Sequence, residues 1–300
     1  MHSIMKIMKT FFRYFWILLL LTGIGRGQID LLKDLTPAPL PKGAEFSSIA
    51  VSRFGDIYLL ENKRHEIYRL KDDGKILNVN GGYGWDKGQF DTPADISIAS
   101  GLDLIVADYN NHRIVRFDRE LNYITCYPDP NSDYQLSFPR SVILSGLGEI
   151  FILEDENSEI VRLNVRQNDI TVFAGIEYGR YSLMEPQLIR MTKSGLVTVL
   201  EKSGKLLQFD RYGTPLIQLS VPFESEVLSM VLIDDDVLLM FAEEPYLLYR
   251  SKSLEEWFPP VISGFDIPRK FIAGTYKNEQ LYLLDSSGRT LICSVDKSVR

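Results

Sequence analysis

Short apolar runs alternate with polar turns along most of the chain, which is the pattern of β-strands. Residues 104–107 and 114–117 are two such runs, and a polar turn separates them. Runs of this length, bounded by turn residues, predict strands. A glycine-rich loop, a proline and a further short apolar run precede them within residues 81–100. Residues 81–118 therefore predict one antiparallel sheet.

The same unit recurs along the chain at intervals of 40 to 47 residues. Five of the six units carry an acidic residue four positions after the start of the middle strand, and three carry a proline eleven positions before it. A period of this size with several strands in each unit predicts an all-β, six-bladed β-propeller rather than an ordinary β-rich domain. The predicted middle strands begin at Ile57, Leu104, Ile150, Val197, Val237 and Leu281; the acids are Glu61, Asp108, Glu154, Glu201 and Asp285; the prolines are Pro93, Pro139 and Pro186.

The second unit resembles the NHL repeat, which is named for an Asn-His-Leu triplet. The resemblance rests on residues 88–90 (Gly-Gln-Phe), on Pro93, on residues 107–108 (Ala-Asp) and on residues 111–113 (Asn-His-Arg). The other five units keep the apolar skeleton and lose the triplet. The resemblance implies an NHL-type six-bladed propeller of a secreted, bacterial type. It implies no single activity, because the family includes interaction modules, sensor domains and a few enzymes.

Residues 1–27 have the pattern of a secretory signal peptide. The basic residues Lys6, Lys9 and Arg13 precede an apolar stretch at 14–24, and Gly25 and Gly27 follow it. This arrangement predicts export to the periplasm or the extracellular space, with residues 28–300 forming the propeller. An uncleaved N-terminal anchor is the alternative, although the stretch is short for a span of about 20 apolar residues. We expect the mature chain not to span a membrane.

Residues 29–35 form a short apolar strand outside the repeats, and the last unit supplies only three strands. We therefore expect residues 29–35 to pair with residues 291–295 as the missing outer strand. A ring that is closed in this way leaves no open sheet edge between its first and last blades.

The charge of the chain argues against nucleic acid as a partner. The net charge is −7, and removal of residues 1–27, with four basic residues and no acids, leaves 29 basic against 40 acidic residues, or −11. Nucleic acids select basic faces. We expect a protein or glycan partner and a monomeric chain.

Few residues suggest catalytic or metal chemistry. The mature chain has two histidines, His65 and His112, at equivalent positions of neighbouring units, which cannot form a three-histidine zinc site. Asp108, Asn111, His112 and Arg113 are expected to hold a turn through hydrogen bonds. Cys126 and Cys293 fall in distant units and are expected to be unpaired and at least partly buried. No cofactor is expected; the acidic run at 234–236 leaves Ca²⁺ as the alternative.

The remaining candidate is one face of the propeller, made by the loops that enter the inner strands and the loops that follow the middle strands. Residues of mixed charge with exposed aromatics suit protein or glycan contacts. We therefore expect an exported, non-enzymatic scaffold that binds through this face. The alternatives are a propeller hydrolase or lyase with a metal in the central channel, and a membrane-anchored sensor domain. The expected contact residues are Arg140, Gln187, Asp95, Tyr109, Asn110, Arg64, Trp85 and Lys270.

Overall fold

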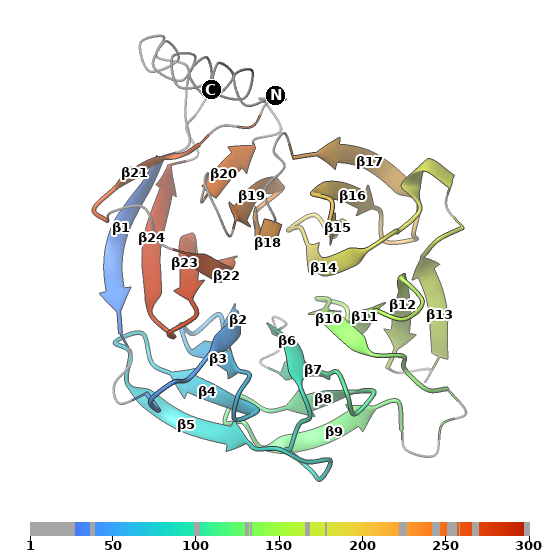
Figure 1. The fold of residues 1–300 in the computed structure, drawn as a ribbon, viewed down its shortest axis with the longest axis horizontal. Helices are drawn as coiled ribbons and strands as arrows, with labels where there is room; N and C mark the ends of the chain where they lie inside the picture. The colour runs from blue at the N-terminus through green and yellow to red at the C-terminus, as the bar shows by residue number, and fades with distance from the viewer. Residues whose placement is uncertain are drawn as a thin grey trace, which may run out of the picture.

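The computed structural model shows an all-β ring of sheets around a central axis (Figure 1). Among the described residues there is one short 3-10 helix, Gly179–Tyr181, and no α-helix. None of the described segments is a helix long and apolar enough to cross a membrane. The predicted signal peptide, residues 1–27, lies outside the described residues. The structure describes residues 28–36, 40–98, 103–129, 132, 134–165, 169–177, 179–221, 227–241, 247–250, 257, 259–265 and 270–296.

Four of the sheets follow the predicted repeat, with four antiparallel strands in chain order from the axis outward (Figure 1). The first holds β2 (Phe46–Val51), β3 (Ile57–Glu61), β4 (Glu66–Leu70) and β5 (Ile76–Gly81). The second holds β6 (Pro93–Ile98), β7 (Leu104–Asp108), β8 (Arg113–Phe117) and β9 (Tyr123–Tyr127). The third holds β10 (Pro139–Leu144), β11 (Glu149–Glu154), β12 (Glu159–Asn164) and β13 (Asp169–Ala174). The fourth holds β14 (Pro186–Met191), β15 (Val197–Glu201), β16 (Lys205–Phe209) and β17 (Pro215–Ser220).

The prediction of six blades is wrong, because only five sheets of the described chain are complete blades with four or more strands. The next sheet has three strands, β18 (Val227–Ile233), β19 (Asp236–Phe241) and β20 (Leu247–Arg250). The strand that follows, β21 (Val261–Ser263), pairs in parallel with β1 (Gln28–Leu35) and so belongs to the last sheet. That sheet has the order β21-β1-β24-β23-β22, with β22 at Phe271–Lys277, β23 at Gln280–Asp285 and β24 at Thr290–Asp296.

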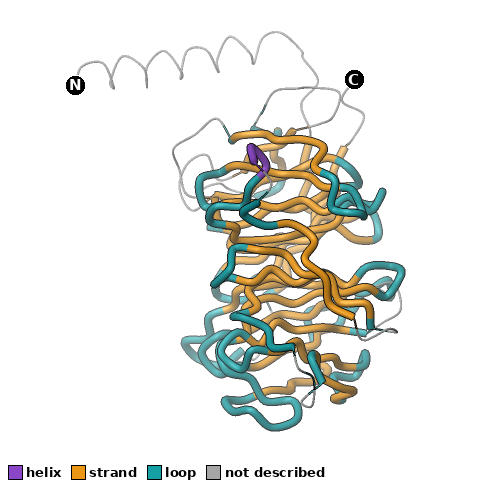
Figure 2. Tube along the Cα trace, turned by 90° about the vertical axis from the view of Figure 1, so that its right-hand side faces the viewer, coloured by secondary structure: helices purple, strands orange, loops and turns teal. Residues whose placement is uncertain are grey.

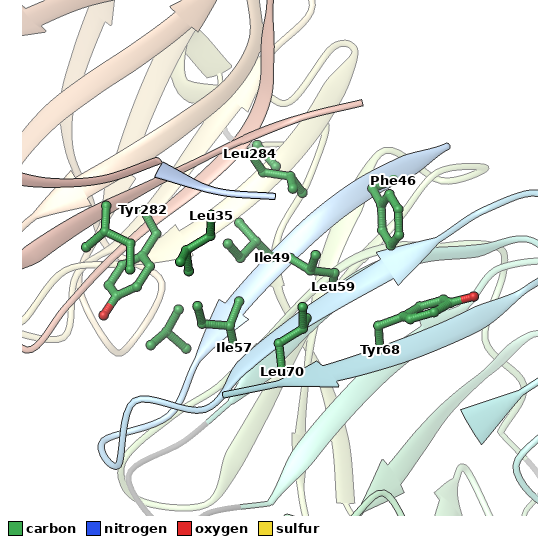
Figure 3. Close-up of a cluster of buried hydrophobic side chains, with 12 residues drawn as sticks. Leu35, Phe46, Ile49, Ile57, Leu59, Tyr68, Leu70, Tyr282 and Leu284 are labelled. Atoms are coloured by element: carbon green, nitrogen blue, oxygen red, sulfur yellow. The ribbon is translucent and has the colours of Figure 1, made fainter. Parts of the chain in front are cut away.

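The two ends of the described chain meet in this five-stranded sheet. Strand β1 is antiparallel to β24, with Ile29 opposite Val295 and Leu35 opposite Thr290. The predicted pairing of residues 29–35 with residues 291–295 is thus confirmed. Leu35 packs with Ile49 and Leu59 of the first sheet and with Leu284 of the last (Figure 3), so β1 also joins these two sheets.

The middle strands are buried on both faces because each sheet packs against its neighbours around the ring. Every residue of β3, β7 and β15 is buried. Their apolar side chains fill clusters shared by adjacent sheets, as expected of strands covered on both sides. The loops consequently gather on the two faces of the disc (Figure 2), and we call the face that carries the connections into β6, β10 and β14 the loop face.

Candidate binding face and central channel

The repeated acid at the end of each middle strand has a structural role. The buried Asp108 carboxylate accepts hydrogen bonds from the Asp91 amide at 2.8 Å, from Asn111 Nδ2 at 2.9 Å and from Arg113 Nε at 2.8 Å. These are the turn contacts that the sequence predicts for Asp108. Burial raises the pKa of this carboxyl, and the three donors act in the opposite direction.

Three further acids hold the loop that enters the adjoining inner strand in the same way. The side chains of Glu61, Glu154 and Glu201 accept hydrogen bonds from backbone amides at 2.8, 2.7 and 2.9 Å. Asp285 differs, because it accepts from the amides of its own turn, at Ser287 and Arg289. A buried carboxylate with its acceptor positions filled by backbone amides fixes loop geometry and leaves little capacity for a ligand. The donor amides in the first group belong to Glu45, Ser137 and Met184.

Arg113 and Asn111 hold the glycine-rich loop that precedes β6. Arg113 donates to the carbonyl oxygens of Trp85 at 2.7 Å and Gln89 at 2.9 Å, and Asn111 donates to the carbonyl of Gly84 at 2.8 Å. The loop is therefore anchored from behind while the Trp85 side chain remains 76% exposed. Trp85 thus projects from an ordered loop, and a loop that is already ordered loses little conformational freedom on binding.

His65 and His112 connect neighbouring sheets. His65 Nδ1 accepts the Thr92 amide at 2.9 Å, and His112 Nδ1 accepts the Phe138 amide at 3.4 Å. Both histidines have positive φ, of 59° and 54°. In both cases the donor amide belongs to the residue directly before the proline that begins the inner strand of the next sheet. In the sequence, both histidines lie eight residues after the start of the middle strand of their unit, which indicated equivalent positions. The hydrogen bond to the next sheet was not predicted.

Tyr109, Arg140 and Asp155 form a cluster on the loop face. Arg140 Nε and Nη2 donate to the two oxygens of Asp155 at 2.8 and 2.6 Å, and the Tyr109 hydroxyl donates to the same carboxylate at 2.7 Å. The Arg140 guanidinium lies 5.9 Å from the centre of the Tyr109 ring. Arg140 also holds the pKa of Asp155 below its ordinary value. Beside the cluster is a cavity of about 500 Å³ that Gln187 and Lys202 also line.

The central channel contains a buried polar network. Asp95 on β6 accepts from Arg190 Nη1 at 2.8 Å and Nη2 at 3.1 Å, from the Ser48 hydroxyl at 2.8 Å and from the Ser141 hydroxyl at 2.6 Å. These four side chains come from the inner strands of the four regular sheets. Arg190 lines two channel cavities, each of about 190 Å³, and Asp95 lines the one on the loop-face side. The network therefore crosses the channel between its two mouths.

Comparison with known proteins agrees with the repeat in the second sheet. The family model of the NHL repeat matches residues 90–117, which run from the glycine-rich loop to the end of β8. "Protein brain tumor" of Drosophila melanogaster is 29% identical over 139 residues, which are 45% of this chain and 13% of that protein. The chain carries an NHL repeat in a β-propeller fold. It spans only a small part of the length of this relative.

Solved structures of low sequence identity share the fold of this NHL propeller. A streptogramin B lyase superposes with a TM-score of 0.62 at 12% identity, covering 90% of this chain and 98% of the lyase. Virginiamycin B lyase from Staphylococcus aureus gives 0.62 at 14% identity, covering 89% and 99%. A structural genomics protein of unknown function from Bacteroides thetaiotaomicron gives 0.64 at 9% identity, covering 89% and 73%. At these identities the likeness concerns the fold alone.

The predicted contact residues of the NHL propeller lie in different surroundings. Arg140 and Gln187 line the loop-face cavity, and Tyr109 donates to Asp155 at its edge. Trp85 and Lys270 are exposed. Asn110 and Arg64 make contacts within the protein: Asn110 donates to Asp91 and Thr92, and Arg64 donates to the Lys42 carbonyl.

The sequence analysis expected Asp95 to be a contact residue of the loop face. The structure instead buries Asp95 in the channel network. Its partner Arg190 was not anticipated. In the described part of the chain, no three His, Cys, Asp or Glu side chains are placed to hold a metal ion. Cys126 and Cys293 are free thiols, as predicted, with Cys293 buried.

Proposed function

We propose that this NHL propeller is a non-enzymatic, monomeric scaffold that binds a protein partner through its loop face. The observation that carries the proposal is the Tyr109–Arg140–Asp155 cluster beside a cavity of about 500 Å³. Tyrosine and arginine are enriched among the residues that dominate the binding energy of protein interfaces, and Arg140 and Asp155 line the cavity. The exposed Trp85 extends the same face.

The loop face is built before a partner arrives, which supports its use as a binding surface. Backbone amides bound to Asp108, Glu154 and Glu201 fix its loops, and the Arg140–Asp155 pair fixes the cluster. Preorganised loops reduce the entropy that is lost on binding. NHL-repeat propellers present such loops from a rigid ring, which suits a general role in protein binding.

We also propose that the protein is exported, with residues 1–27 as a cleaved signal peptide. The basic, apolar and small-residue segments in that order support this. Expression of the full chain in a secreting host, followed by N-terminal sequencing of the released protein, tests it. A start near Gln28 agrees with the proposal, whereas a membrane-bound product with an intact N-terminus favours the anchored alternative.

The binding proposal is tested by comparing variants on the two faces of the disc. A partner is first captured with the purified protein and identified, and its dissociation constant is then measured by calorimetry. Trp85→Ala and Arg140→Ala on the loop face are expected to weaken binding at least about tenfold each. Phe54→Ala and Leu147→Ala are the controls, because these exposed side chains lie in the β2–β3 and β10–β11 turns of the opposite face. Equal effects on both faces, or loss only in the control pair, would refute the proposal.

A further inference from the structure

We infer that the loop-face mouth of the central channel binds a carboxylate, supplied by an aspartate or glutamate side chain of the bound protein. This inference rests on the proposed use of the loop face and names the chemistry that the channel recognises there. Neither the half-buried Tyr109 nor the exposed Trp85 lines that mouth.

The channel mouth has the size for one side chain. Its cavity of about 190 Å³ is lined by Arg140, Gln187, Arg190, Ser229 and the Asp95 carboxyl that is paired with Arg190. The rest of the lining is made by Ser47, Ser48 and apolar residues. Cavities of about 150 Å³ in proteins admit a molecule as large as benzene. The carboxyl group and methylenes of a glutamate therefore fit without rearrangement of the inner strands.

The Ser229 hydroxyl is the first indication of an absent acceptor. Ser229 is 3% exposed and lines the cavity, and its hydroxyl has no hydrogen-bond partner within the described part of the chain. The side-chain amide of Gln187 is likewise without one among those residues. Buried polar groups in proteins are nearly always paired, by protein, by water or by a ligand. The hydroxyl of Ser229 and the half-buried amide of Gln187 can therefore donate to a ligand in this cavity.

The Asp95–Arg190 pair leaves hydrogen-bond donors, and no free carboxylate acceptor, at the channel mouth. Asp95 already accepts from both Arg190 Nη atoms, from the Ser48 and Ser141 hydroxyls, and from the amides of Ile96 at 2.9 Å and Val142 at 3.2 Å. Its lone pairs are filled, so an entering cation would find no free acceptor there. Arg190 has five N–H protons, and its Nε–H and one Nη2–H have no acceptor among the described residues.

Hydrogen-bond donors, rather than net charge, select the ligand. The positive charge of Arg190 is neutralised by Asp95, and that of Arg140 by Asp155. In the outer cavity the charges of Glu185 and Lys202 cancel. A carboxylate can accept from the guanidinium, the hydroxyl and the amide at once, and charged acceptors form the stronger hydrogen bonds. The isosteric amide of glutamine carries no charge and has only one acceptor oxygen for the donor-only guanidinium of Arg190, so it should bind less well.

The channel mouth opens toward the surface on which a partner would lie. Arg140 and Gln187 line both the channel cavity and the outer cavity of about 500 Å³. A peptide segment that lies across the outer cavity can thus direct one acidic side chain toward the axis.

The inference is tested with two capped tripeptides, acetyl-Gly-Glu-Gly-amide and acetyl-Gly-Gln-Gly-amide, titrated against the full chain and followed by NMR. The glutamate peptide is expected to bind at least about fivefold more tightly than the glutamine peptide. Ser229→Ala and Gln187→Leu should each remove most of this preference. Thr275→Val, in the cavity on the other side of Arg190, is the matched control and should leave the preference unchanged.

Equal affinity for the two peptides, or an unchanged preference in both Ser229→Ala and Gln187→Leu, would overturn the inference. Tighter binding of free glutarate than of the glutamate peptide would overturn the assignment to a protein side chain. Circular dichroism establishes that each variant is folded. If the preference is absent while Trp85→Ala still weakens the captured partner, the carboxylate site fails and the binding scaffold stands. If Trp85→Ala and Arg140→Ala have no effect on the partner, the scaffold itself fails.

Discussion

Asp95 and Arg190 meet in the central channel although 95 residues separate them in the sequence. Asp95 belongs to β6 and Arg190 to β14, and the sheet of β10 lies between theirs. Ser48 of β2 and Ser141 of β10 bind the same carboxylate. One ion pair thereby ties together the inner strands of four sheets.

Loss of the Asp95 carboxylate should destabilise the ring. Asp95→Asn leaves the Arg190 guanidinium without its counterion in a mostly buried site, and breaking a buried pair in this way costs about 3–5 kcal/mol. The free energy of unfolding, measured by urea denaturation, should fall by that amount. Asp103→Asn, which breaks the half-exposed pair with Arg116, is the control and should cost less than about 1 kcal/mol. Equal losses in the two variants would contradict the role given to Asp95.

The closing strand β1 should contribute to the stability of the ring only through the side chains of its buried face. Ile29 is 1% exposed and packs with Leu281, Leu283 and Cys293, whereas Leu32 on the same strand is 54% exposed. Ile29→Ala is expected to lower the free energy of unfolding by about 2–5 kcal/mol, because it leaves a cavity in that cluster. Leu32→Ala should change it by less than about 0.5 kcal/mol. A mild effect of Ile29→Ala in thermal or urea denaturation would show that β1 does not close the ring.

The Arg140–Asp155 pair should stabilise the protein at neutral pH and not in acid. The pKa of Asp155 lies below its ordinary value of 3.8, chiefly because of the Arg140 hydrogen bonds. The folded state therefore favours the ionised carboxylate, and its contribution is full above the unfolded pKa and is lost as the pH falls through the folded pKa. Both groups are partly exposed, so the contribution is under about 1 kcal/mol.

Unfolding of the wild type and of Asp155→Asn at several pH values checks this sign. The difference in their free energies of unfolding should shrink as the pH is lowered from 7 to 3. A difference that grows in acid would show that Asp155 is not held in its ionised form by Arg140.

The two cysteines should differ in reactivity. Burial raises the pKa of the Cys293 thiol to about 12, and its sulfur is inaccessible, whereas Cys126 is only partly buried and lines a cavity of about 570 Å³. Because the thiolate is the reactive form, a maleimide should label Cys126 alone in the native protein and both thiols after denaturation. Rapid native labelling of a Cys126→Ser variant would contradict the buried position of Cys293.

Local periodicity predicted the strands well, because each apolar run lies between turn residues. The run at 104–107 became β7, and Asp108, which follows it, accepts from Asn111 and Arg113 of its own turn as expected. The additional hydrogen bond from the Asp91 amide was not predicted. The sheet that β21 joins could not be predicted from local pattern, because its parallel pairing with β1 joins residues more than 230 positions apart. This pairing is the reason that one sheet has three strands and that the count of complete blades is five.

The channel network was not predicted from the sequence, in which Asp95 was expected to be a contact residue of the loop face. Ser48, Asp95 and Ser141 each follow the first residue of an inner strand by two positions, and Leu188 occupies that position in β14. Arg190, two positions further along the same face of the strand, supplies the cation instead. Whether a side chain reaches across the channel depends on the curvature of the ring. The spacing of residues in the sequence does not determine that curvature.

The central claim is that the loop face is the working surface of the propeller. Hydrogen–deuterium exchange of the full chain, with and without the captured partner, tests it most directly. We predict slower exchange on binding in residues 82–92, 109–113 and 184–187, and no change in the opposite turns at residues 52–56 and 145–148. Protection confined to those opposite turns would contradict the account.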